Sequence, residues 1–198
     1  LAKAEKAASS KRLSDDQKAE VSKSLDAIGD EGEKNGVTIG IGQLNPGVGA
    51  QAQLTGYSRD GEGNVTGALI RITVSETASS SSLLAGSIAH EGYHAAQNQA
   101  AVAVWAATGN YVTAYNGPAN LSQYDTENQA YHVSAYVARG LGRSSLTFTP
   151  ATGNGYTIWK RGMAEPDQRV LDALISDHYR VTPTAPNPRY LLPAPPSQ

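Results

Sequence analysis

Residues 89–97 read AHEGYHAAQ, and they lie inside an alanine-rich stretch, from Leu83 to about Ala106, that contains no proline. Such a stretch predicts a long helix. Four helical positions bring the chain to about 40° past a full turn, so the imidazoles of His90 and His94 leave one face and can bind a single metal ion. Glu91 lies about 100° around the axis from His90. That place suits a base acting on a metal-activated water, although two histidines on a helix can also be ordinary polar surface.

Composition limits the partners and the kinds of site. The chain has 198 residues and a net charge of −2, without a dense run of lysine and arginine, which argues against nucleic acid as a partner. The longest uninterrupted apolar stretch, Ala100 to Ala107, is far shorter than the about 20 residues that cross a bilayer, so no membrane span is expected. The chain has no cysteine, so nitrogen and oxygen atoms must hold any metal.

Hydrophobic periodicity and turn residues predict helices and strands on both sides of this helix, which indicates an α+β fold. The expected helices cover residues 15–28, 83–106 and 122–139, and a last helix carries Val170 to Ile175. The expected strands cover residues 37–41, 53–58, 65–74, 147–149 and 156–160, whereas the connection at 109–120 is expected to be irregular.

The two ends of the chain differ from its middle in composition. Residues 1–13 are expected to form a linker or a frayed N-terminal segment, residues 14–181 one domain, and residues 182–198 a proline-rich extended tail. The chain begins at Leu1 and contains a single methionine, Met163, which predicts a processed product.

A downstream carboxylate is the best candidate for the third protein ligand that a catalytic zinc site normally has. On the helix expected over residues 122–139, Glu127 lies in the middle of the stripe of small and apolar residues. A carboxylate there is stranded in the core unless a positive group meets it. A metal ion or an ordinary buried ion pair would both meet this need. His132 and Asp125, on the opposite side of the helix, are expected to face solvent.

The motif at residues 90–94, followed on a later helix by Glu127-Asn128-Gln129-Ala130-Tyr131, resembles the zincin metallopeptidases. Within them it is most similar to the gluzincin branch, where a downstream Glu is the third zinc ligand. It also resembles bacterial metallopeptidase domains found at the ends of large polymorphic toxins. The similarity covers about residues 70–141.

This resemblance implies a zincin-like fold, in which a small, mostly antiparallel sheet packs against an active-site helix and a second, ligand-bearing helix. It implies Zn²⁺ bound by His90, His94 and Glu127, with Glu91 as general base. It also implies an edge strand that pairs with extended substrate, and residues 68–74 lie at the right place in the chain.

Two features depart from the thermolysin-type pattern. The 33 positions from His94 to Glu127 form a longer interval, and the residue four after Glu127 is Tyr131 instead of an aspartate. The acceptor that orients His90 or His94 is therefore unassigned. Tyr131 is the first choice for a donor to the developing oxyanion, with a core phenol as an equal alternative. His178 and Tyr179 are the next candidates.

The predicted function is zinc-dependent hydrolysis of peptide bonds by an endopeptidase, acting on a peptide or protein in a bacterial secreted or exported setting. Zinc fits mixed nitrogen and oxygen ligands best, although other divalent ions can occupy such a site. Two alternatives stay open: a zinc-stabilised binding module without turnover, and a zinc amidase that acts on cell-wall peptide. Oligomeric state is not predicted.

Overall fold

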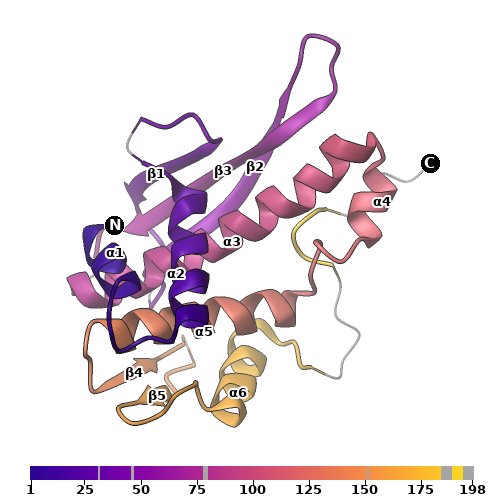
Figure 1. Cartoon of the computed structure of the whole chain (residues 1–198). Coiled ribbons are helices and arrows are strands. Elements are labelled where there is room, and N and C mark those ends of the chain that lie inside the picture. The colour runs from indigo at the N-terminus through magenta and orange to yellow at the C-terminus, as the bar shows by residue number, and fades with distance from the viewer. Residues whose placement is uncertain (31, 46, 78–79, 151, 184–188, 194–198) are drawn as a thin grey trace.

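The computed structural model of the chain describes residues 1–198 except 31, 46, 78–79, 151, 184–188 and 194–198 (Figure 1). Its elements, in chain order, are α1 (Ala2–Ala8), α2 (Asp15–Ile28), β1 (Val37–Gly42), β2 (Ala50–Arg59), β3 (Val65–Ser75), α3 (Ser81–Thr108), α4 (Tyr111–Asn116), α5 (Gln123–Gly140), β4 (Ser145–Phe148), β5 (Tyr156–Lys160) and α6 (Gln168–Tyr179). The fold is therefore α+β, as expected, and the segment expected to be irregular contains the short helix α4.

The helix boundaries follow from capping side chains. Ser14 accepts a hydrogen bond from the backbone N–H of Gln17, whose side chain in turn accepts from Ser14, so α2 begins with a complete capping box. Ser80 caps the start of α3, and Gly109 ends that helix in the left-handed conformation at φ 63°. These caps satisfy backbone groups that have no partner within the helix.

The three-stranded sheet has the order β1-β3-β2. Strand β2 pairs antiparallel with β3, whereas β1 pairs parallel with it. The expectation that residues 68–74 form an edge strand is therefore wrong, because they belong to β3, which has a partner on each side. Strands β4 and β5 form a separate antiparallel pair.

Helix α3 is the central element, and it packs against the sheet and against α2 and α5 (Figure 1). On its sheet side, Ile70 and Ile72 of β3 lie in one core with Ile88 and Val102 of α3. Ala89 and Tyr93, also on α3, lie in a second core with residues of α1, α2 and α5. A third core joins α5 to the β4–β5 pair and to α6. The middle of α3 is thus buried on all sides, which explains why the motif at residues 90–94 is buried.

The N-terminal segment is not a linker. Ala4 and Ala7 of α1 are fully buried, and a Cβ placed on Gly140 of α5 would lie 2.6 Å from the Ala7 carbonyl oxygen. Small residues on both helices allow this close contact, so a sequence without an apolar stripe of large side chains still packs.

The C-terminal segment also departs from an independent extended tail in the part that the structure describes. Arg189 forms an isolated bridge with Ser122, and Leu191 and Leu192 are buried in the core on the sheet side of α3. The side-chain oxygen of Asn120 accepts hydrogen bonds from the backbone N–H groups of both leucines. Residues 184–188 and 194–198 of the expected tail lie outside the described residues.

Across the described residues, no helix combines the length and the apolar character needed to cross a membrane.

Candidate metal centre

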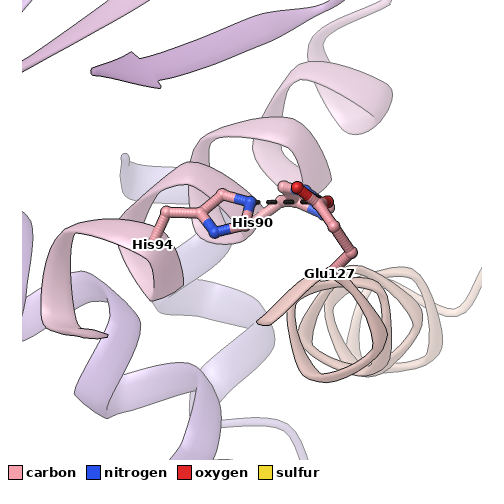
Figure 2. A group of neighbouring side chains, drawn as sticks. All are labelled: His90, His94 and Glu127. Atoms are coloured by element: carbon pink, nitrogen blue, oxygen red, sulfur yellow. Dashed lines mark ion pairs between the residues drawn. The ribbon is translucent and has the colours of Figure 1, made fainter. Parts of the chain in front are cut away.

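Three side chains meet where α3 lies against α5. Figure 2 shows the imidazoles of His90 and His94, both on α3, and the carboxylate of Glu127, on α5, pointing toward one another. Glu127 Oε2 lies 3.4 Å from His90 Nε2 and 3.6 Å from His94 Nε2. All three residues are buried, and Glu127 is only 2% exposed. The structure thus brings together the three residues that the sequence pointed to as metal ligands.

Small residues allow this approach of the two helices. Ala85 and Ala89 of α3 and Ala130 and Ser134 of α5 are all buried between them. On the other side of α3, Gly92 faces α2, and a Cβ there would lie 2.3 Å from the carbonyl oxygen of Ser24. Helix α3 therefore packs closely against both α5 and α2. Larger side chains at these positions would force the helices apart.

The three residues carry interdependent charges. Burial disfavours the charged form of His94, but the adjacent Glu127 carboxylate outweighs this and raises the pKa of His94 to about 9. Burial likewise disfavours the charged form of Glu127, yet the charge of His94 and the contact with His90 lower the pKa of Glu127. A negative group is thus maintained in the core beside two imidazoles.

The donor set fits a metal ion. The distances of 3.4 and 3.6 Å exceed ordinary hydrogen bonds, and Glu127 Oε2 is buried without a hydrogen-bond partner among the described residues. Two ligand atoms that share one ion at about 2 Å each lie about 3–4 Å apart, which matches this spacing. An ion would also satisfy the oxygen that is otherwise unpaired. His90, His94 and Glu127 could therefore hold a metal ion.

Glu91 lies on α3 beside the three residues and faces the sheet. Its Oε2 accepts a hydrogen bond of 2.6 Å from the backbone N–H of Ala52 in β2. Burial raises the pKa of Glu91, although His90, His94 and the Ala52 N–H group oppose this shift. A carboxylate with a raised pKa accepts and releases a proton closer to neutral pH, as a general base requires.

The residue that orients His90 comes from α5. Ser134 Oγ lies 3.5 Å from His90 Nδ1 and donates a 3.3 Å hydrogen bond to the Gly86 carbonyl. The Ser134 hydroxyl therefore orients His90, a role for which the sequence offered no acidic residue. His94 Nδ1 is buried and has no hydrogen-bond partner within the described part of the chain.

A small cavity of about 70 Å³ lies beside His90 and Glu91. It is lined by the two site residues His90 and Glu91 and by all three candidate donors, Tyr131, His178 and Tyr179. The Tyr131 ring meets the His90 ring edge-on, with centroids 4.8 Å apart. Burial, followed by the charge of Glu127, raises the pKa of Tyr131. The Tyr131 ring therefore contacts the His90 ring and also lines the cavity.

Two site features were missed by the sequence reasoning. The first is the backbone N–H group of Ala52, which no side-chain pattern can reveal. The second is Tyr190, a 46% exposed residue whose pKa is raised to about 12 by partial burial and by the charges of Glu127 and Glu91. The adjacent apolar pair at residues 191–192 was the available signal that this segment packs against the domain. His132, which was expected to face solvent, is instead half-buried beside Glu165 and is not one of the three clustered residues.

No protein-family model, curated protein or solved structure matches this chain.

Proposed function

We propose that the chain is a zinc-dependent metallopeptidase of the zincin type, with His90, His94 and Glu127 as the zinc ligands and Glu91 as the general base. One observation carries this proposal: a fourth buried residue, the carboxyl-bearing Glu91, lies beside a His₂Glu donor set. A site that only stabilises the fold has no need of a free carboxylate next to its ligands.

The choice of zinc follows from the ligand types. Two neutral imidazoles and one carboxylate match the protein ligands of catalytic zinc sites, which keep one position open. When bound, zinc would acidify a water molecule and polarise the scissile carbonyl. Ser134 helps to hold His90 in the tautomer that presents Nε2 to the ion.

Glu91 would take the proton from the attacking water and later give it to the leaving amine. The Ala52 N–H group holds its Oε2, which limits the directions that the carboxylate can face. Tyr131, Tyr179 and His178 line the adjacent cavity and are the candidate donors to the oxyanion that develops on the substrate carbonyl.

Strand β2 supplies the substrate edge. It lies at the end of the sheet order, and its Ala52 N–H group reaches Glu91, away from β3. An extended peptide could therefore add to β2 beside Glu91 by backbone hydrogen bonds. Strand β2, and not residues 68–74, is therefore the proposed edge strand that pairs with extended substrate.

The test compares Glu91→Gln with the wild type and with Glu76→Gln, a matched change at an exposed glutamate. All three proteins should bind one zinc ion per chain, measured by metal analysis. Glu91→Gln should lose about 10²–10⁴-fold of the hydrolysis rate on casein and on a peptide library, because proton transfer contributes that much.

Two outcomes would change the assignment. Equal behaviour of the three proteins, with zinc bound and no hydrolysis, would support the non-catalytic binding module. Hydrolysis of cell-wall peptide amides alone, lost in Glu91→Gln, would support the amidase.

A further inference from the structure

Five cationic side chains gather around one surface groove of about 550 Å³, which we call the basic groove. They are Lys11, Arg12, Arg139, Arg143 and Arg161. They come from three places: the connection between α1 and α2, the end of α5 with the loop that follows, and the turn after β5. The chain as a whole has a net charge of −2, so this concentration of positive charge is local.

No carboxylate lines the basic groove among the described residues. Its lining contains no aspartate or glutamate, and within the described ranges none of the five cations forms an ion pair. Neutral oxygens hold two of the four guanidinium groups instead. Arg139 Nη1 donates to the Ala164 carbonyl at 2.8 Å, and Arg161 Nη2 donates to the Gly142 carbonyl at 3.1 Å.

Gly142 brings two of the cations together. It has φ 71°, a conformation that favours glycine, and a Cβ there would lie 3.4 Å from the central guanidinium carbon of Arg12. The Arg12 side chain therefore packs against Gly142, whose carbonyl oxygen accepts a hydrogen bond from Arg161. Like charges held close together without counter-charges destabilise a fold, and a bound anion removes this repulsion.

We propose that the basic groove binds an acidic segment of a partner protein. Guanidinium groups bind carboxylates in a planar, two-bonded arrangement, and four of the five cations are arginines. Arg139, at one end of α5, lies about 18 Å along the helix axis from Glu127. A segment bound in the groove would thus dock on the ligand-bearing helix at a distance from the metal centre.

The lining favours an acidic peptide over nucleic acid. Trp159 is the only aromatic residue among the described lining residues, and it is 3% exposed and donates its indole N–H to the Met163 carbonyl. It therefore offers no face on which a base can stack. A compact groove also neutralises fewer phosphates than the extended basic stripe typical of nucleic-acid binding.

The test measures binding of fluorescein-labelled poly-L-glutamate by anisotropy at low salt, with zinc-loaded protein throughout. The variant is Lys11→Glu with Arg143→Glu, because neither side chain makes a hydrogen bond within the described part of the chain. The matched control, Lys34→Glu with Arg169→Glu, makes the same charge change at two exposed positions outside the groove. Circular dichroism confirms that both proteins fold.

Wild type and control should bind the probe, and the groove variant should bind it about tenfold or more weakly, with the difference shrinking as salt rises. Poly-L-glutamate should also raise the melting temperature of the wild type more than that of the variant. Equal binding by variant and control would overturn the proposal. So would a single-stranded or duplex DNA that binds the groove as tightly as poly-L-glutamate at the same salt concentration.

Discussion

Glu127→Gln tests the electrostatic reasoning about the metal centre in the metal-free protein. The substitution keeps the shape of a side chain that is 2% exposed and removes its charge. Burial lowers the pKa of His94, but Glu127, with a smaller effect of Glu91, outweighs this and raises it from 6.5 to about 9, and each pKa unit corresponds to about 1.36 kcal/mol. The variant should therefore lose about 3 kcal/mol of unfolding free energy, which agrees with the range for breaking a buried pair.

The loss depends on pH in a defined direction. Because the folded pKa of His94 is raised, its contribution is fully present below 6.5 and disappears as pH rises through about 9. Because the folded pKa of Glu127 is lowered from 4.5, its contribution is present above 4.5 and disappears as pH falls through the folded value. The difference between wild type and variant should therefore be greatest between about pH 4.5 and 6.5.

Urea unfolding after treatment with a chelator measures this difference at about pH 5.5 and about pH 9.5. In thermal unfolding at the lower pH, the melting temperature of the variant should be about 6–12 °C below that of the wild type, since 1 kcal/mol is worth about 2–4 °C in a chain of this size. Glu76→Gln, at an exposed site, should leave stability unchanged. Equal stability of Glu127→Gln and wild type at pH 5.5, or a gap that persists unchanged at pH 9.5, would refute the reasoning.

Three further results are expected. Gly92→Ala should cost about 1–3 kcal/mol in urea unfolding, because its Cβ would lie 2.3 Å from the Ser24 backbone oxygen. Gly40→Ala, with no heavy atom within 4 Å, should cost less, and equal losses would contradict the contact. Asp177 accepts hydrogen bonds from Thr152 and Tyr156, which lower its pKa below 3.8. Asp177→Asn should therefore reduce stability at neutral pH, and the difference should fade as pH drops below 3.8; a difference independent of pH would exclude this origin. Zinc added to the chelator-treated protein should raise its melting temperature with concentration, measured by calorimetry, and no shift at saturating zinc would exclude binding to the folded state.

Much of the metal centre was predictable because it depends on local periodicity. Spacing alone places His90 and His94 on one helix face, and the position of Glu127 in a small, apolar stripe predicts its burial. The structure brings the three side chains together in a buried group that could hold a metal ion. Local signals also predicted most helices, since capping residues such as Ser14 act within one turn.

Contacts between distant parts of the chain could not be predicted in this way. Residues 68–74 have the alternation of a half-buried strand whether they lie at an edge or in the centre, so only pairing with β1 and β2 decides the question. The docking of α1 depends on Ala7 meeting Gly140. No local sequence pattern predicts a contact between residues this far apart in the chain.

The sequence by itself determined which residues can bind a metal and on which helices they lie, because helical geometry converts spacing into direction. Only the tertiary structure decided that β2 is the strand beside Glu91, that Ser134 orients His90, and that five scattered cations share one groove. These features join residues that are remote along the chain. Their proximity depends on how the helices and strands pack around α3, and that packing is a property of the whole core.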